Sequence, residues 1–184
     1  GALGYQGYEN PSFLSTPGAK DVGIEFYTFS KTFNMAGWRL AFATGNEQMI
    51  EALNLIQDHL FVGIFPALQE AGIAALLDPK SEEAVAQLNA TYDSRRDAFV
   101  QAAAKIGWQA FPSRGSFYAW MPVPEGDTSE SFADLLLEKA HVAVAPGKGF
   151  GPAGDAYVRI GLLVEPERLV EAVNRIADLQ LFNN

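Results

Sequence analysis

Residues 27–45 read YTFSKTFNMAGWRLAFATG, and this stretch determines how the rest of the chain is interpreted. It opens with apolar and aromatic residues typical of a buried strand, and the run ends at Lys31. A loop containing Gly37 follows, then Arg39, and a second apolar run begins at Leu40. A lysine at the end of a strand is commonly only a solvated terminus. Here the flanking residues are apolar, so we expect the amine to emerge from a core, where desolvation favours its neutral, nucleophilic form.

Lys31 and Arg39 together suggest a site for an aldehyde that also carries a phosphate group. A nucleophilic amine forms an imine with an aldehyde. A guanidinium group binds a phosphate dianion through two parallel hydrogen bonds. Pyridoxal phosphate carries both an aldehyde and a phosphate, so the two residues could hold the two ends of this one cofactor.

The segment from Thr28 to Ala41 resembles the lysine signature of the class I/II pyridoxal-phosphate aminotransferases of fold type I. In that signature a serine or glycine stands three positions before the lysine, and an arginine stands eight positions after it, as Arg39 does here. The resemblance implies that Lys31 is the Schiff-base lysine and the proton shuttle. It also implies that Thr28 and Arg39 bind the cofactor phosphate. Thr28 departs slightly from the signature but keeps the hydroxyl group.

Composition excludes several other classes of function. The 184 residues are 48% hydrophobic, which is enough for the cores of one or two domains. A net charge of −9 without a basic cluster argues against a nucleic-acid partner. The two histidines, His59 and His141, are too scattered for a metal site, and the absence of cysteine fits a cytoplasmic protein. No apolar run approaches the roughly 20 residues of a membrane span, and no charged-then-apolar leader opens the chain.

Predicted strands and helices along the chain indicate an α/β protein. Strands are expected at residues 24–29 and 39–44, both apolar enough to be covered on two faces. Asn46 is a good N-cap for a helix from Glu47, whose apolar stripe we interpret as core packing. The other predicted elements are helices at 66–77 and 79–107, helices opening at 128 or 129 and at 165, and strands at 108–111, 117–121, 142–145 and 157–163.

A glycine-rich loop at residues 147–154 precedes the predicted strand that carries Arg159. Because this loop leads into a strand rather than a helix, it does not match a phosphate cradle, and we interpret it as a flexible lid or a tight loop. Arg159 lies in an apolar strand, where a charge needs a partner or a ligand unless strand alternation places it on a solvated face.

The aminotransferase family has an arginine in this strand that binds the substrate α-carboxylate, and Arg159 matches its position. Residues 115–120, GSFYAW, also resemble a Gly-Gly-Phe/Tyr strand of the family, with Ser116 in place of the second glycine. Arg114 stands beside this segment, either as a contact for the substrate side chain or as a solvated loop residue.

The resemblance implies three parts of a fold type I aminotransferase. Residues 1–65 would be a remnant of the large pyridoxal-phosphate-binding domain, residues 66–94 connecting helices, and residues 95–184 a small α+β C-terminal domain. The family's aspartate and tyrosine that hold the cofactor ring would precede Gly1, so we expect a trimmed or truncated product. We expect these 184 residues alone to hold no cofactor and to be inactive, with the strands near Lys31 left with uncovered apolar faces.

The function implied by the resemblance is transfer of an amino group between an amino acid and a 2-oxo acid. The expected enzyme is a cytoplasmic homodimer that binds neither nucleic acid nor membrane. Two alternatives stay open, and Lys31 and Arg39 would serve the first of them equally well. One is a pyridoxal-phosphate-dependent carbon–sulfur β-lyase on the same fold. The other is a non-catalytic, aminotransferase-like module that senses a ligand.

Overall fold

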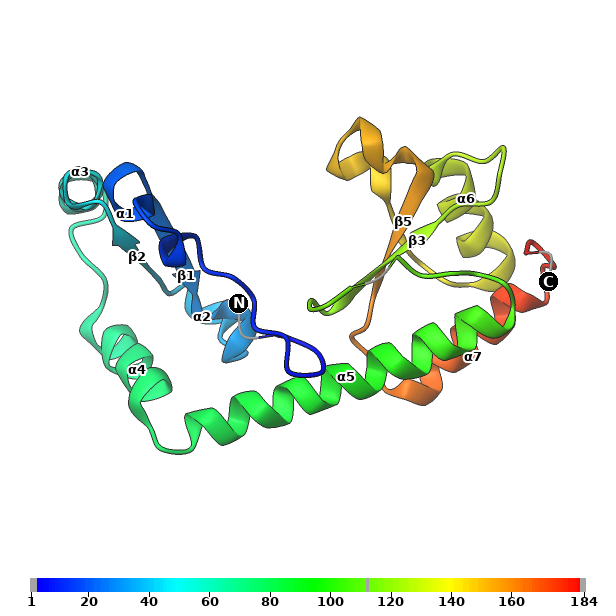
Figure 1. The fold of residues 1–184 in the computed structure, drawn as a ribbon, viewed down its shortest axis with the longest axis horizontal. Helices are drawn as coiled ribbons and strands as arrows, with labels where there is room; N and C mark the ends of the chain where they lie inside the picture. Colours follow the sequence, from blue (N-terminus) through cyan, green and yellow to red (C-terminus); the bar gives the residue numbers. More distant parts are fainter. Residues whose placement is uncertain (1–2, 112, 183–184) are drawn as a thin grey trace. The chain divides into compact units, whose positions relative to one another are not determined.

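A computed structural model describes residues 3–111 and 113–182 of the chain (Figure 1). The structure divides into two compact units between Asn89 and Ala90. The division falls inside the segment 66–94 that we expected to connect two domains. Assignment of those domains to a large cofactor-binding part and a small C-terminal part stays a prediction.

A two-stranded antiparallel hairpin organises the first unit. Strand β1 (Ile24–Thr28) pairs with strand β2 (Ala41–Gly45), and Tyr27 lies opposite Phe42 in the register. Both strands are shorter than predicted at the end that carries the lysine stretch. The helical elements of this unit are η1 (Phe13–Ser15), α1 (Ala19–Val22), α2 (Phe29–Thr32), η2 (Ala36–Trp38), α3 (Glu47–Leu60), α4 (Pro66–Leu77) and the first part of α5 (Ser81–Lys105).

A small core lies beneath the turn between the two strands. Phe29, Met35 and Leu40 are buried and form one cluster. Helix α4 packs against this cluster through Gly72, where an added Cβ would lie 2.7 Å from Cδ2 of Leu40. The missing side chain of Gly72 therefore lets α4 approach closely enough to cover the cluster with Ala71.

Much of the remaining apolar surface of the first unit is exposed. Phe26 of β1 is 64% exposed and Phe42 of β2 is 42% exposed, so the two strands are not covered on both faces as predicted. The expectation of uncovered apolar faces near Lys31 is confirmed. Asn46 does cap α3, because its side chain accepts a hydrogen bond from the backbone N–H of Met49. However, α3 has no buried residue, and the interpretation of its apolar stripe as core packing is wrong for this chain.

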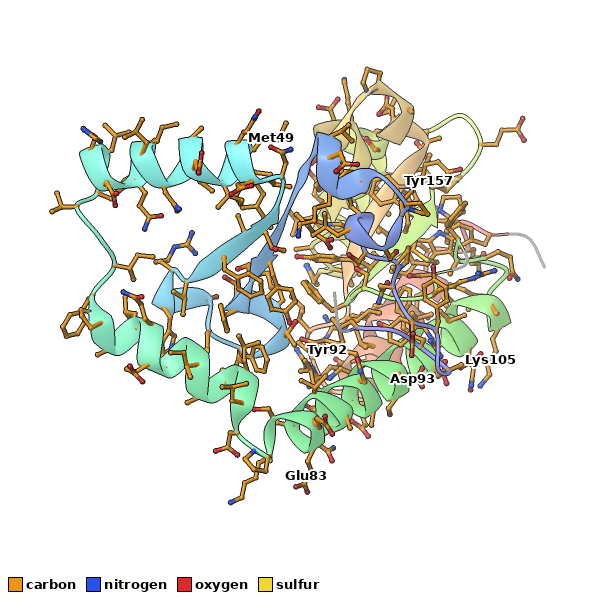
Figure 2. The ribbon with its side chains drawn as sticks, turned by 60° about the vertical axis from the view of Figure 1, so that its left-hand side comes forward. Met49, Glu83, Tyr92, Asp93, Lys105 and Tyr157 are labelled. Carbon is orange, nitrogen blue, oxygen red and sulfur yellow. The ribbon has the colours of Figure 1, made fainter. Side chains whose placement is uncertain are left out.

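Helix α5 is the longest element and contains the division between the units. It begins at Ser81, two residues after the predicted start, and Oδ1 of Asp78 accepts a hydrogen bond of 2.8 Å from the backbone N–H of Lys80 just before it. Figure 2 shows Glu83, Tyr92, Asp93 and Lys105 spread along this helix. It ends close to the predicted stop, where Gly107 adopts a positive φ of 82°.

The second unit is built on a three-stranded antiparallel sheet. Strand β5 (Tyr157–Gly161) lies in the centre, between β3 (Tyr118–Pro122) and the two-residue β4 (Ala145–Pro146). The predicted strand at 142–145 is thus reduced to its end. The helical elements are the last part of α5, α6 (Ser129–Leu135), η3 (Leu136–Ala140), η4 (Gly147–Phe150), η5 (Pro152–Ala156) and α7 (Pro166–Ala177).

One face of this sheet carries the main core. Strand alternation turns Met121 of β3 and Val158 of β5 toward α5, α6 and α7. Residues of all three helices belong to the same buried cluster. Trp108 is buried in this cluster, and its Nε1–H donates a hydrogen bond of 2.7 Å to the carbonyl of Pro122. The predicted strand at 108–111 is wrong, because the structure shows no strand there and a buried aromatic residue in an irregular segment instead. The other face of the sheet carries Arg159.

Candidate active site

Lys31 lies in the one-turn helix α2, directly after strand β1. Thr28 ends the strand and caps this turn, since its hydroxyl oxygen accepts a hydrogen bond from the backbone N–H of Ser30. The buried Phe29 donates its N–H to the carbonyl of Leu40 at 3.2 Å and accepts from the N–H of Met35 at 3.4 Å. Phe29 therefore ties the lysine turn both to the opposite strand and to the loop that follows.

Arg39 lies at the other side of the same turn. Its backbone adopts the left-handed region with φ of 52°, and its Nη1 donates to the carbonyl of Ala36 at 3.1 Å. Thr28 pairs with Ala41 in the register, only two residues beyond Arg39. The structure thus brings Thr28, Lys31 and Arg39 to one end of the hairpin. All three side chains are exposed, so the expectation that the amine emerges from a buried core is wrong for the residues described.

The charge pattern of this hairpin end fits a phosphate-bearing ligand. Residues 26–46 contain two cations, Lys31 and Arg39, and no aspartate or glutamate, although the chain carries a net charge of −9. A hydroxyl and a guanidinium can donate hydrogen bonds to a phosphate. An amine can react with an aldehyde. The residues present therefore fit pyridoxal phosphate in charge and in chemistry.

Arg159 lies on the sheet face opposite the core of the second unit. It pairs with Trp120 on one side and with Ala145 on the other, and its side chain is half-buried. The guanidinium carbon lies 4.1 Å from the ring centroid of Tyr118 and 4.3 Å from that of Phe150. Within the part of the chain that the structure describes, no acidic side chain forms an ion pair with Arg159. Aromatic rings, rather than a carboxylate of the described residues, accompany this charge.

A cavity of about 410 Å³ opens beside Arg159. Its wall brings together two cations, Arg159 and Arg114, with aromatic and hydroxyl side chains. Ser116 lines it as well and adopts a positive φ of 84°, while its Oγ accepts a hydrogen bond from the N–H of Tyr118. The position where the resemblance expects glycine therefore has a backbone that favours glycine. Whether Arg114 contacts a substrate stays a prediction.

The glycine-rich loop is the tight form of the two expected alternatives. Gly147 and Gly154 approach so closely that a Cβ on Gly147 would lie 2.2 Å from the carbonyl oxygen of Gly154. The buried Ser129 donates its hydroxyl to Oδ1 of Asp155 at 2.8 Å and accepts the N–H of Lys148 at 3.2 Å. Hydrogen bonds from Ser129 hold the pKa of the Asp155 carboxyl below its ordinary value. The loop is thus pinned at both of its ends.

Sequence reasoning identified Arg159 but missed the residues that surround it. Tyr118 and Phe150 contact the guanidinium, and Ser129 and Asp155 fix the loop that carries Phe150. Period-two alternation in the predicted strand was a usable signal for Tyr118. Tyr118 lies two residues from Trp120, on the same face of the strand, and Trp120 pairs with Arg159 across the sheet. No local periodicity linked Phe150 to Arg159, although Phe150 stands in the Pro-Gly…Phe-Gly…Gly stretch that resembles the family.

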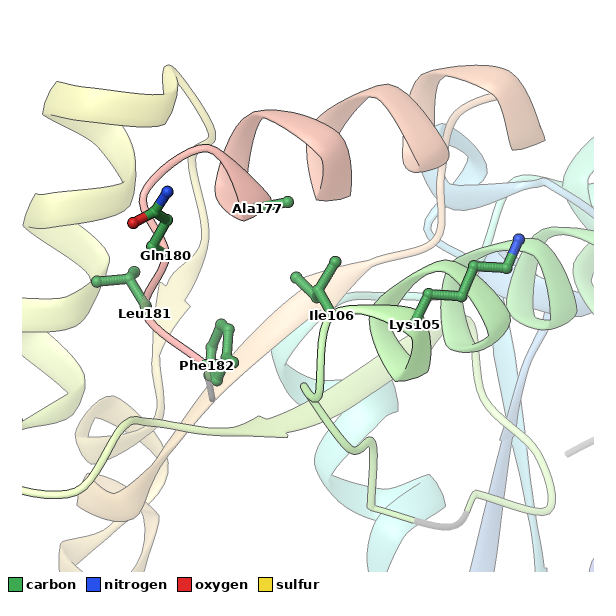
Figure 3. Close-up of a pocket in the computed structure, with 6 residues that line it drawn as sticks. All are labelled: Lys105, Ile106, Ala177, Gln180, Leu181 and Phe182. Carbon is green, nitrogen blue, oxygen red and sulfur yellow. The ribbon is translucent and has the colours of Figure 1, made fainter. Parts of the chain in front are cut away.

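Two further cavities lie away from Arg159. Figure 3 shows one of about 240 Å³ in the second unit, where Lys105 directs its ammonium group away from the apolar Ile106 and Phe182. A cavity of about 420 Å³ in the first unit lies beside Glu25 and Tyr27. Over residues 3–111 and 113–182, no group of three or more histidine or acidic side chains is placed to hold a metal ion. None of the described helices is both long and apolar enough to cross a membrane.

Comparison with known proteins decides the family. The model of the aminotransferase class I and II family matches residues 5–176. The chain belongs to this family. Its members are pyridoxal-phosphate-dependent, in agreement with the cofactor expected from the lysine stretch.

Among curated relatives, L-glutamine–4-(methylsulfanyl)-2-oxobutanoate aminotransferase of Bacillus subtilis is 59% identical over 99% of this chain and 45% of its own length. The LL-diaminopimelate aminotransferase of Moorella thermoacetica is 48% identical over 94% of this chain and 44% of its own length. The chain therefore spans about half the length of the curated relatives it matches.

Solved structures confirm the α/β fold. Apo-BacF from Bacillus subtilis matches 100% of this chain and 47% of its own with a TM-score of 0.92 at 45% identity. An aminotransferase from Staphylococcus aureus matches 100% of this chain and 48% of its own with a TM-score of 0.93 at 39% identity. Family membership and fold are thus established independently of the roles of the site residues.

Proposed function

We propose that the protein carrying this chain transfers an amino group between an amino acid and a 2-oxo acid with the help of pyridoxal phosphate. The observation that carries the proposal is the gathering of Thr28, Lys31 and Arg39 at one acid-free end of a hairpin, in a chain of the aminotransferase family. The relative at 59% identity makes L-glutamine and 4-(methylsulfanyl)-2-oxobutanoate the first pair of substrates to test.

Each site residue has a proposed role. Thr28 and Arg39 bind the cofactor phosphate, Arg39 through charge-assisted hydrogen bonds. When bound, pyridoxal phosphate supplies an aldehyde and an electron-withdrawing ring that stabilises negative charge at the substrate α-carbon. Lys31 would hold the cofactor through its aldehyde carbon, and its amine, once released, would move the proton at the substrate α-carbon as a general base. Arg159 binds the substrate α-carboxylate.

The wider assembly is part of the same proposal. Residues 1–65 would belong to a large cofactor-binding domain and residues 95–184 to a small C-terminal domain, with residues 66–94 between them. The enzyme would act as a cytoplasmic homodimer, without nucleic acid or membrane as a partner. Support comes from family membership and from the acidic composition.

Substitution of Lys31 tests the proposal in the intact protein that carries this chain. Lys31→Ala should lower turnover with the glutamine pair by about 100-fold to 10,000-fold or more, because one group supplies both the nucleophile and the general base. Borohydride reduction of the wild-type protein with cofactor should add the mass of the reduced cofactor to the peptide containing residue 31. Lys20→Ala removes an exposed lysine of α1 and serves as the control.

Two results would overturn this assignment. Wild-type turnover by the Lys31→Ala protein would show that another residue does the work. Release of a 2-oxo acid and ammonia from an amino acid alone, without an acceptor acid, would indicate the β-lyase instead. Loss of the mass label together with loss of turnover supports amino-group transfer through Lys31.

A further inference from the structure

Two aromatic rings accompany the guanidinium of Arg159, and each ring is braced by another. Tyr118 comes from β3 and lies diagonally across the sheet from Arg159, with its ring centroid 4.6 Å from that of Phe117. Phe150 comes from η4 and meets the ring of Trp120 at 5.9 Å with a steep angle of 73°. Trp120 stacks in turn on Tyr157 at 5.6 Å. The sheet face opposite the core thus forms an aromatic layer around one cation.

Contact with aromatic rings suits a guanidinium that must bind an anion. A ring face attracts a cation without accepting the in-plane N–H groups as a carboxylate would. Those N–H groups stay available for a bidentate partner, which the described residues do not supply from an acidic side chain of their own. A guanidinium held in advance also loses less side-chain freedom when the partner arrives.

The glycine-rich loop fixes the ring of Phe150. Phe150 is the last residue of η4, and only about half of its surface is covered, with 53% exposed. Its position depends on the close approach of Gly147 to Gly154 and on the hydrogen bonds of Ser129 with Asp155 and Lys148. The loop therefore serves as a scaffold for one side chain rather than as a phosphate cradle or a lid.

We propose that Tyr118 and Phe150 are positioning residues that hold the guanidinium of Arg159 for the substrate α-carboxylate, and that the glycine-rich loop exists to present Phe150. This proposal rests on the carboxylate-binding role given to Arg159 above. It assigns to the two rings a share of the affinity for every carboxylate substrate of the enzyme, regardless of the substrate side chain.

Ring removal in the intact protein tests the proposal. Phe150→Leu and Tyr118→Leu should each raise KM for the amino acid about threefold to tenfold, the size of a partly exposed cation–π contact, with little change in kcat. Phe150→Tyr and Tyr118→Phe keep a ring and should restore KM. Phe13→Leu makes the same change at a ring that is 46% exposed in the first unit, and is the matched control.

A carboxylate probe separates positioning from a general structural role. Butanoate should inhibit competitively, and its inhibition constant should rise in the two leucine variants by the same factor as KM. Butanamide has the same shape without the charge, and any inhibition by it should be the same in the wild-type protein and the two leucine variants. In an Arg159→Ala background the leucine substitutions should have no further effect, because no guanidinium is left to position.

The outcomes distinguish this proposal from the one on which it rests. If Arg159→Ala leaves KM and butanoate inhibition unchanged, Arg159 does not bind the carboxylate, and both assignments fail. If Arg159→Ala raises both constants but neither leucine variant does, only the role of the rings is wrong. A ring effect that persists in the Arg159→Ala background also overturns it. Because Phe150 is largely exposed, its leucine variant keeps the test valid even if Tyr118→Leu fails to fold.

Discussion

The hairpin of β1 and β2 and the three-stranded sheet of the second unit each position a cation, but the packing that supports that cation differs greatly between them. Lys31 and Arg39 stand on a turn above a core cluster of three buried residues, Phe29, Met35 and Leu40. Arg159 stands on the central strand of a sheet whose other face is backed by a large cluster from three helices. Its guanidinium also contacts two rings of its own unit.

This difference indicates how much of each binding function the chain organises by itself. The side chains at the hairpin are exposed, and the strands beneath them present Phe26 and Phe42 to the surface. At the sheet, the unit that carries Arg159 supplies the strand, the rings and the pinned loop. We therefore expect the backbone of the sheet to be more stable against unfolding than the backbone of the hairpin.

The largest expected effect is the loss of Trp108 from the core behind the sheet. Trp108→Ala should lower the free energy of unfolding of the second unit by about 3–5 kcal/mol, because it leaves a large cavity beside Phe99 and Phe132 and an unpaired carbonyl at Pro122. Amide hydrogen exchange in the intact protein measures the effect unit by unit, as faster exchange in β3 and β5.

Trp38 provides a matched control in the other region. Trp38 follows the lysine turn and is 47% exposed, so Trp38→Ala should cost about 1 kcal/mol or less. Equal destabilisation by the two substitutions would show that the hairpin is as firmly packed as the sheet, and the comparison between the two regions would fail.

The two arginines should fail in different ways, and this is the next largest effect. Arg39→Ala should weaken cofactor retention by about 10-fold to 100-fold, because the phosphate loses a charge-assisted contact of about 1.5–3 kcal/mol. Arg159→Ala should leave the cofactor bound and raise KM for amino acids instead. Equilibrium dialysis of the cofactor and steady-state kinetics measure the two constants on the same preparations.

Arg168→Ala serves as the control for this pair, since the Arg168 side chain is 67% exposed and forms an ion pair with Glu171 of the same helix. Neither constant should change in that variant. If Arg39→Ala and Arg159→Ala both release the cofactor and leave substrate kinetics untouched, Arg159 has a structural role, and the division of tasks between hairpin and sheet is wrong.

Local signals in the sequence predicted most helix ends and the proximity of Thr28, Lys31 and Arg39. The N-cap Asn46 is a short-range feature confirmed by its hydrogen bond, and of the two predicted helix starts at 128 or 129 the structure has Thr128 as the N-cap. Thr28, Lys31 and Arg39 fall within a dozen consecutive residues, so their proximity hardly depends on the rest of the fold. The predicted limits of the strands beside them were wrong, because Thr28 caps a helical turn that apolar periodicity does not reveal.

The residues around Arg159 required long-range information. Tyr118 meets Arg159 only because of the register between β3 and β5, and Phe150 only because of the path of a loop pinned by Ser129. Long-range packing also explains the wrong strand prediction for residues 108–111. Their apolar and aromatic composition suits a strand, but the burial of Trp108 against helices determines their irregular backbone.

The smallest expected effect concerns backbone strain, since each region holds a residue other than glycine at positive φ, Arg39 at the hairpin and Ser116 beside the sheet. Ser116 has no charge to preserve, so its strain can be released. Ser116→Gly should raise the free energy of unfolding of the second unit by about 0.5 kcal/mol. Release of the backbone strain at φ of 84° outweighs the lost hydrogen bond to Tyr118 and the added conformational freedom of the unfolded chain. Ser116→Ala keeps the strain and loses the hydrogen bond, so it should lower that free energy by about 0.5–1.5 kcal/mol. Thermal unfolding of the three proteins gives the order, and an alanine variant more stable than the glycine variant would show that no strain is stored beside Arg159.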